Sequence, residues 1–311
     1  MDYLFSVRGR KGNGYSNQIG GMKFLAVPTN KNDLTKDCEV TKTSWFKSVE
    51  ENCGIGPDKK GNVVVFIHGF NTEQYSMLER HRKIRKGLED HGYDGAVVSF
   101  DWPSDGVALG YSSDRRDARQ AADRLFHHAI RKFSADQKPD CQVNVNVLAH
   151  SMGNYLLREA FDYADDDHET AQKSWMVSQV AMVAADISAN SMADGNPKSS
   201  SLFRHSARVT CYYSPLDEIL NISEVKRIGV ARRLGRVGLP KNCPEKAVNL
   251  YCGAHYKQHK DDFEFDSGIS HKWYFDSPKF YEDLYHTFMG KLDRSEIETR
   301  APTSLGNLAL I

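Results

Sequence analysis

From Asn62 onwards, the 311-residue chain alternates between short apolar runs and stretches in which apolar residues recur at helical spacing. The six runs are rich in valine and lie at 63–67, 96–100, 143–148, 177–183, 209–213 and 247–251. Continuous apolar runs of strand length are typical of strands buried on both faces of a parallel sheet. Alternation of such strands with helices favours right-handed βαβ units. The sequence therefore predicts an α/β fold with a mostly parallel central sheet and helices on both faces.

The charge balance excludes some classes of partner. The chain carries 41 basic and 41 acidic side chains, so its formal net charge is zero, and we expect no nucleic-acid partner. No run approaches the roughly 18 uncharged apolar residues that a transmembrane helix needs. The N-terminus lacks the apolar run of a signal peptide. We therefore expect a cytoplasmic protein without a transmembrane segment, in which the six cysteines stay reduced.

Composition divides the chain into three parts. Residues 1–60 are rich in glycine and read as an irregular segment with possible edge strands of the same domain. Residues 61–292 form the α/β domain, and residues 293–311 read as a loosely held tail. Within the α/β domain, we expect a long surface loop at 188–206 and a basic, solvated loop at 226–246. Nothing in the sequence indicates the oligomeric state.

A candidate nucleophile follows the third apolar run. The residues after 143–148 are Ala149-His150-Ser151-Met152-Gly153, and a stretch with helical spacing comes next. In an open parallel sheet, reactive groups collect at the carboxyl ends of the strands. A serine on a sharp strand-to-helix turn needs small neighbours because strand and helix come close together there. The alternative is a plain N-cap serine, and the placement favours a nucleophile.

The segment Val-Leu-Ala-His-Ser-Met-Gly-Asn at 147–154 resembles the nucleophile elbow of α/β-hydrolase esterases and lipases, with Ala149 in place of the commoner first glycine. The segments at 65–72, 98–106 and 184–187 are similar to a mostly bacterial, uncharacterised α/β-hydrolase family catalogued as domain of unknown function 900. The resemblance covers roughly residues 60–290. It implies the α/β-hydrolase fold and serine hydrolase chemistry without organic cofactor or metal, and it implies no particular substrate.

A serine hydroxyl needs an imidazole to accept its proton, and this fold carries that histidine late in the chain. His271 lies in the loop before the last predicted helix and is the expected base. His286 falls on that helix and fits a surface or packing role better. His255 and His259 are four residues apart, as in a helical metal pair, but no carboxylate motif accompanies them, so we expect no metal site.

Two aspartates compete to orient the imidazole. Asp217 follows the run at 209–213, which is the usual position of the acid in this fold. Asp186 follows the preceding run and serves some members of the superfamily. We favour Asp217 and keep Asp186 as the alternative.

The oxyanion that forms during acyl transfer needs N–H donors aimed at it beforehand. The fold supplies one donor from the residue after the nucleophile, here Met152, and another from the loop after the first central strand, here Phe70. Further residues of the neighbouring turns are expected to line the pocket or to hold the loops: His68, Gly69, Asn71, Asp101, Trp102 and His150.

These residues predict a serine hydrolase that cleaves a small-molecule carboxylic ester or thioester through an acyl-enzyme on Ser151. The preference for an ester rests on analogy with the fold. Two alternatives remain at this point. One is a binding or scaffold protein that keeps the fold without turnover. The other is an acyl hydrolase effector that a partner gates through the loops at 188–206 or 226–246.

Overall fold

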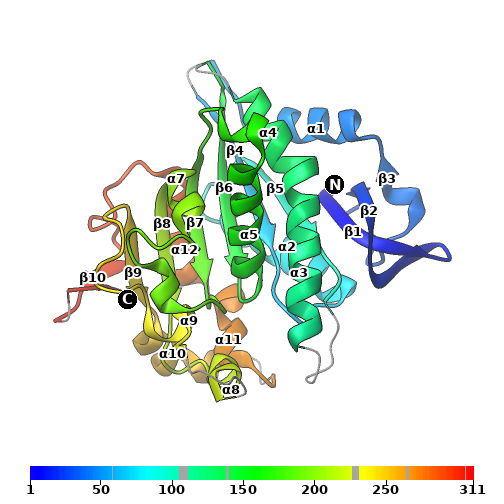
Figure 1. The fold of residues 1–311 in the computed structure, drawn as a ribbon. Coiled ribbons are helices and arrows are strands. Elements are labelled where there is room, and N and C mark those ends of the chain that lie inside the picture. The colour runs from blue at the N-terminus through cyan, green and yellow to red at the C-terminus, as the bar shows by residue number, and fades with distance from the viewer. Residues whose placement is uncertain (58, 105–110, 138–139, 226–230, 264–265, 305) are drawn as a thin grey trace.

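A computed structural model describes the chain except for residues 58, 105–110, 138–139, 226–230, 264–265 and 305, and except for the side chains of residues 111–114 and 223–225. An 11-stranded sheet crosses the molecule in the order β10-β11-β9-β8-β7-β6-β4-β5-β1-β2-β3 (Figure 1). The strands are β1 (Asp2–Lys11), β2 (Gly14–Val27), β3 (Glu39–Val40), β4 (Gly61–Ile67), β5 (Ala96–Asp101), β6 (Val143–His150), β7 (Val177–Val183), β8 (Ser206–Tyr213), β9 (Ala247–Tyr251), β10 (Arg300–Pro302) and β11 (Leu308–Leu310).

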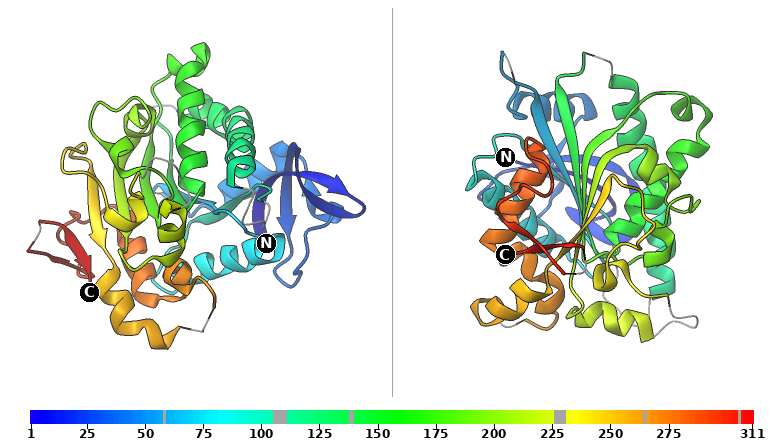
Figure 2. Two further views of the ribbon diagram at one scale, coloured as in Figure 1. Left: turned by 60° about the horizontal axis from the view of Figure 1, so that its bottom comes forward. Right: turned by 90° about the vertical axis from the view of Figure 1, so that its left-hand side faces the viewer.

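Helices cover both faces of this sheet (Figures 1 and 2). The α-helices are α1 (Lys42–Glu51), α2 (Gln74–Glu89), α3 (Tyr111–Leu125), α4 (Arg131–Asp136), α5 (Gly153–Asp166), α6 (His168–Ala171), α7 (Ser200–Arg204), α8 (Glu218–Val225), α9 (Leu234–Val237), α10 (Gly253–His259), α11 (Ile269–Lys272) and α12 (Pro278–Met289). A π-helical turn, η2 (Phe126–Ile130), joins α3 to α4. The short 3₁₀ turns are η1 (Lys36–Cys38), η3 (Ala189–Met192), η4 (Lys260–Asp262) and η5 (Trp273–Asp276).

The six apolar runs each lie within one strand, from β4 to β9, and these strands pair in parallel with their neighbours. One apolar core lies between the sheet and α3, η2 and α5, and a second lies between the sheet and α2 and α12. The prediction of a mostly parallel sheet with helices on both faces is therefore confirmed. Among the described residues, no helix is both long and apolar enough to cross a bilayer.

The first 60 residues are more regular than the sequence suggested. β1 pairs in parallel with β5, and β2 and β3 extend the sheet beyond it. β1 is hard to recognise because its buried side chains include Asp2, Ser6 and Arg8. Arg8 Nε lies 2.8 Å from Asp101 Oδ1, and Ser6 Oγ donates to Asp101 Oδ2 over 2.7 Å. These contacts tie the N-terminal strand to the end of β5.

The C-terminal segment is also held by a buried ion pair. β10 pairs with β11, and β11 lies beside β9, at the end of the sheet opposite β3 (Figure 2). Arg300 donates from Nε to Asp283 of α12 over 2.7 Å, and neither side chain is exposed. The expected loose tail is therefore wrong for this part of the chain.

The segment at 188–206 also differs from the expected surface loop. It holds η3 and α7, and it buries Met192, Leu202 and Phe203. Part of the basic loop at 226–246, residues 226–230, lies outside the described residues. In the described part of this loop, Arg233 is buried and pairs with Asp186.

Candidate active site

Ser151 occupies the turn between β6 and α5 with a positive φ of 54°. A positive φ is uncommon for a non-glycine residue and persists only where surrounding contacts hold it. Here the Ser151 N–H donates to Val183 O over 3.0 Å, and the Ser151 carbonyl accepts from the Asp186 N–H over 3.1 Å. The turn therefore presents the serine at the carboxyl edge of the sheet in a fixed orientation.

Two glycines make room for this turn. A Cβ atom on Gly153 would lie 2.5 Å from the Ile67 carbonyl oxygen, at the end of the neighbouring strand β4. A Cβ atom on Gly69 would lie 2.7 Å from Ser151 Cβ. Both separations are far below van der Waals contact. The loop after β4 and the serine turn thus fit together only because these positions lack side chains.

His271 and Asp217 meet at the same edge of the sheet. His271 Nδ1 lies 2.6 Å from Asp217 Oδ2, and both side chains are buried. Asp217 Oδ1 accepts from the Leu220 N–H over 2.9 Å, which fixes the carboxylate from its other side. The loops that carry the two residues are also joined, because the Glu218 N–H donates to Ser270 Oγ over 3.2 Å. The carboxylate of Asp217 therefore binds Nδ1 of the His271 imidazole, and Nε2 lies on the opposite side of the ring.

His150 connects His271 to the serine turn. Its Nε2 lies 3.0 Å from the His271 carbonyl oxygen, so this nitrogen carries the proton and donates, and the two rings are centred 4.6 Å apart. Burial, and then the nearby charges of His271 and Arg80, hold the pKa of His150 well below its usual value. His150 is thus a neutral residue that links His271 to the chain directly before Ser151. The sequence identified His150 as a neighbour of the nucleophile and gave no sign of this bond.

Within the described residues, the Ser151 hydroxyl and His271 Nε2 form no hydrogen bond to one another. Contacts between a nucleophile and its base are often long without substrate and tighten in the reacting complex.

The predicted oxyanion loop lies against the serine. Gly69 packs on Ser151, Asn71 has a φ of 51°, and Thr72 Oγ1 donates to the Gly69 carbonyl over 3.2 Å. Among the described residues, neither the Phe70 N–H nor the Met152 N–H finds a hydrogen-bond acceptor. Two backbone donors next to the nucleophile are therefore available to a ligand.

His68 is structural. Its Nδ1 lies 2.8 Å from the Gly69 carbonyl and its Nε2 accepts from the Trp102 N–H over 3.1 Å, so the proton resides on Nδ1. Burial lowers the pKa of His68, which fits this neutral form. Trp102 stacks on the ring and donates from Nε1 to the His68 carbonyl over 2.9 Å. His68 and Trp102 therefore fix the start of the loop after β4.

Asp101 is also a structural residue. It is fully buried against Arg8 and Ser6. Burial alone would raise the pKa of the carboxyl, but the contacts with Arg8 and His68 together lower it. Asp101 thus fixes the start of the loop after β5. The sequence had left open whether Asp101 and Trp102 line a pocket or fix a loop, and their burial gives them the second role.

The residues considered as alternatives to His271 and Asp217 make other contacts. Asp186 Oδ1 lies 3.2 Å from Arg233 Nε, so its carboxylate is engaged by a cation. His255 contacts Ser277 Oγ, His259 pairs with Asp262, and His286 lies on α12 as expected. Among the described residues, no group of three histidine, cysteine, aspartate or glutamate side chains is arranged to hold a metal ion.

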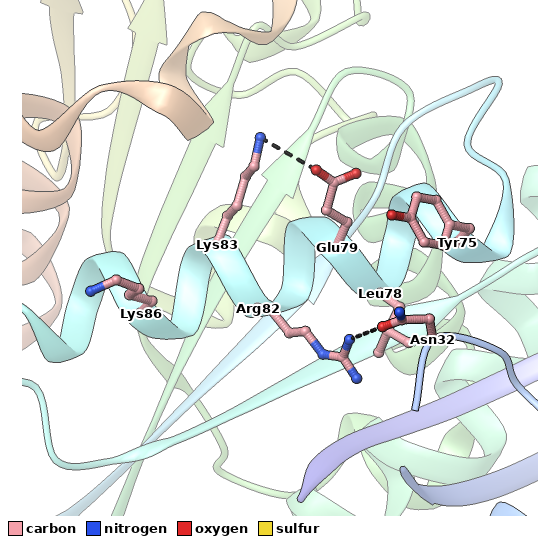
Figure 3. Close-up of a pocket in the computed structure, with 7 residues that line it drawn as sticks. All are labelled: Asn32, Tyr75, Leu78, Glu79, Arg82, Lys83 and Lys86. Carbon is pink, nitrogen blue, oxygen red and sulfur yellow. Dashed lines mark hydrogen bonds and ion pairs between the residues drawn. The ribbon is translucent and has the colours of Figure 1, made fainter. Parts of the chain in front are cut away.

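A small hollow on the outer face of α2 is unrelated to this edge. It has a volume of about 250 Å³ and is lined by Asn32, Tyr75, Leu78, Glu79, Arg82, Lys83 and Lys86 (Figure 3). Its cations are already paired, Arg82 with Asp2, Lys83 with Glu79 and Asp276, and Lys86 with Asp90. The hollow therefore offers no unpaired charge to a ligand.

Comparison with known families identifies the chain. Residues 46–287 match the model of a family described as an alpha/beta hydrolase of unknown function (DUF900). The chain belongs to this family. The match confirms both the resemblance drawn from the sequence and the α/β-hydrolase fold.

Among curated proteins, an uncharacterised protein, alr1448, from Nostoc sp. is 42% identical over 62 residues, which are 20% of this chain and 15% of the relative. The chain thus matches only a small part of that relative's length.

Among solved structures, a cutinase-like protein from Cryptococcus sp. has 10% identity and a TM-score of 0.38, with coverage of 76% of this chain and 96% of that one. The product of gene lin2722 from Listeria innocua has 12% identity and a TM-score of 0.40, with coverage of 77% and 97%. The esterase LipW from Mycobacterium marinum has 15% identity and a TM-score of 0.27, with coverage of 61% and 53%. With TM-scores this low, these likenesses carry no functional argument.

Proposed function

We propose that this protein is a serine hydrolase that cleaves carboxylic esters through an acyl-enzyme on Ser151. The observation that supports the proposal most is the 2.6 Å contact between His271 Nδ1 and Asp217 Oδ2 beside a serine with a positive φ. A carboxylate on Nδ1 holds the imidazole in the tautomer whose Nε2 can accept a proton. This is the form that a serine nucleophile needs.

The proposed reaction has two halves. In the first, the Ser151 hydroxyl oxygen bonds to the ester carbonyl carbon while its proton passes to His271 Nε2. The bond from that carbon to the alcohol oxygen then breaks, and the alcohol leaves with the proton from His271. In the second half, water attacks the acyl-enzyme and gives its proton to His271, which returns it to Ser151 as the carboxylic acid is released. Each half passes through an oxyanion, for which the Phe70 and Met152 N–H groups are the proposed donors.

The first test is labelling with a fluorophosphonate probe and turnover of p-nitrophenyl esters. We expect the native protein to react covalently with one probe per chain and to hydrolyse a short-chain ester. Ser151→Ala should abolish labelling and lower kcat by about a million-fold, to background, because the nucleophile is removed. Ser48→Ala on α1 is the matched control and should leave both unchanged.

Two outcomes would contradict the proposal. One is a native protein that neither reacts with the probe nor hydrolyses any ester of the panel. The other is a Ser151→Ala variant that keeps its ester hydrolysis. Thioesters in the same panel test whether the leaving group can be a thiol.

A further inference from the structure

A large apolar cavity lies along β4 and β6, on the face of the sheet that α1, η2 and α4 cover. It has a volume of about 440 Å³, within the range of about 300–1,000 Å³ that small-molecule sites occupy. Residues from β4, β6, α1, η2 and α4 line it, among them Trp45, Phe46, Val65, Ala129, Phe133 and Val145. In Figure 1, α1 and α4 lie at the top of the molecule. Helix α11, which carries His271, and helix α8, which begins directly after Asp217, lie at the bottom.

The cavity is separate from the candidate active site. None of the residues that line it is Ser151, His271, Asp217, Phe70 or Met152. On β6 the lining runs from Val143 to Val147, and on β4 it reaches Ile67, the last residue of that strand. Val147 lies four residues, roughly 13 Å along the chain, before Ser151, so the lining stops short of the serine.

Strands in the middle of a sheet are normally covered by helices on both faces. Here one face of β4 and β6 is not fully covered. Val65 of β4 and Val145 of β6 are only partly buried although their strands have neighbours on both sides. Protein interiors are usually packed to the density of organic crystals, so an apolar space of this size is unusual. The helix above it contains the π-helical turn η2, a feature frequent at functional sites, and Ala129 and Ile130 of that turn line the cavity.

Positive charge gathers at one side of the cavity, around the ring of Phe46. Lys132 Nζ lies 5.2 Å and Lys42 Nζ lies 5.9 Å from the centre of that ring. Lys132 is paired with Asp136 of its own helix, whereas Lys42 forms no ion pair with any described residue. Burial and the charge of Lys132 lower the pKa of Lys42, as expected where two cations share one partly desolvated place.

An anion at this position would relieve the repulsion between the two lysines. Glu50 also contributes to the lining, one turn further along α1 from Phe46 and two turns from Lys42. The charged residues of the lining are Lys132, its partner Asp136, and Glu50. Lys42 lies outside the lining but near the same Phe46 ring, and the remainder of the lining is mostly apolar. A ligand that matches both parts is an amphiphile with one negative head group and an extended hydrocarbon tail.

We propose that this cavity is a binding site for a long-chain fatty acid, with the carboxylate at Lys42 and Lys132 and the tail among the valines of β4 and β6. The site is independent of the proposed hydrolase activity. It would hold its ligand whether or not Ser151 reacts.

The proposal is tested by displacement of cis-parinaric acid, a fluorescent fatty acid, from the full-length protein. We expect saturable binding of one molecule per chain, with displacement that strengthens from octanoate to laurate to palmitate because more apolar surface is buried. Methyl palmitate, which lacks the charge, should bind about tenfold more weakly than palmitate.

Substitutions test the part of the cavity proposed for the hydrocarbon tail and the lysine proposed for the carboxylate separately. Ala129→Phe fills the cavity from η2 and should abolish binding, and Val145→Phe fills it from the sheet in case the first variant folds poorly. Lys42→Ala should weaken palmitate about tenfold and leave methyl palmitate unchanged. The control is Lys47→Ala, on the same helix, because that side chain is 76% exposed and pairs with Glu51 away from the cavity.

Three results would overturn the proposal. The first is the absence of saturable binding of palmitate. The second is unchanged binding in folded Ala129→Phe and Val145→Phe proteins. The third is loss of binding in Ser151→Ala, or in protein labelled at Ser151 by a long-chain fluorophosphonate, because the fatty acid would then occupy the active site. If Lys42→Ala has no effect on palmitate while both filling variants abolish binding, the anionic head group is assigned wrongly and the proposal fails in that form.

Discussion

The two ends of β4 and β6 are packed in opposite ways. At their carboxyl ends, the loop after β4 meets Ser151 so closely that a single methyl group on Gly69 would lie 2.7 Å from the serine Cβ. From their amino ends up to Ile67 and Val147, one face of the same two strands borders an apolar space of about 440 Å³. One pair of neighbouring strands thus supports both the tightest and the loosest packing described here.

This difference follows from what each end is proposed to do. Acyl transfer depends on groups held within a fraction of an ångström of their reacting geometry, which close packing and bonded loops provide. A hydrocarbon tail is bound without directional contacts, so the amino end needs only space and apolar walls. Substitutions at the two ends should therefore have very different consequences.

The largest effect should come from the acid at the carboxyl end. Asp217→Asn keeps the shape of the side chain and removes the charge that orients His271, so we expect kcat to fall by about ten-thousandfold. Asp186→Asn should instead reduce stability, because it leaves Arg233 buried with a weaker partner, and it should keep activity per folded molecule. Ester turnover and urea unfolding of both variants give the measurement. If Asp186→Asn lost the activity and Asp217→Asn kept it, the two aspartates would have to exchange roles.

The next effect concerns the space around the nucleophile. Gly69→Ala should force the oxyanion loop away from Ser151, which lowers kcat by about a hundred-fold and destabilises the fold by about 1–3 kcal/mol. The rate of fluorophosphonate labelling and the unfolding midpoint report the two losses separately. Wild-type labelling by Gly69→Ala would mean that the loop and the serine are not as tightly fitted as the distances indicate.

Lowering the pH should destabilise the protein, because His68 and His150 are buried at the carboxyl ends of the strands with lowered pKa values. An unfolded histidine binds a proton below about pH 6.5, and a folded one with a lowered pKa does not, so stability is present above that pH and is lost as the pH falls. Each such group costs up to ~1.4 kcal/mol per pH unit. His81, on the buried side of α2, has a pKa of about 4 and adds to the same loss.

His150→Gln tests this dependence at one site. Glutamine retains an N–H donor for the His271 carbonyl and does not titrate, so the stability of the variant should fall less steeply between about pH 7 and 5. Unfolding in urea at several pH values provides the slopes. Equal slopes for variant and wild type would show that His150 takes up a proton in the folded state as readily as in the unfolded one.

The comparison also explains what the sequence could and could not predict. The strands β4 to β9 stand out as apolar runs, and Ser151 and Asp217 stand out because they follow two of these runs. His271 stands out as a histidine late in the chain, just before the last helix. β1 was missed because Arg8 and Asp101 neutralise each other only after folding, so a buried strand looks polar in the sequence. β10 was missed for the same reason, through Arg300 and Asp283. β11 has only three residues, which is too short for a pattern to show.

The cavity could not have been predicted either. Valines 63, 65, 143 and 145 form the same apolar pattern whether a helix covers them closely or leaves a space above them. The gap depends on how α1 and α4 approach the sheet, which is a matter of tertiary geometry. Hydrophobic periodicity identifies the face that is buried and carries no information on how well it is filled.

The smallest predicted effect lies on β4, the strand that leads into the loop of Gly69. Val65→Ile adds one methylene group toward the cavity, and since there is space for it, we expect stability to rise by up to ~0.8 kcal/mol. Val64→Ile is the matched control on the next residue, whose side chain faces the other, filled core and is fully buried, so the same group should destabilise the protein by about 1–3 kcal/mol there. The two unfolding midpoints therefore move in opposite directions if the amino end holds open space. Destabilisation by both substitutions would mean that the walls of the cavity close on one another, and the contrast between the two ends of β4 would then disappear.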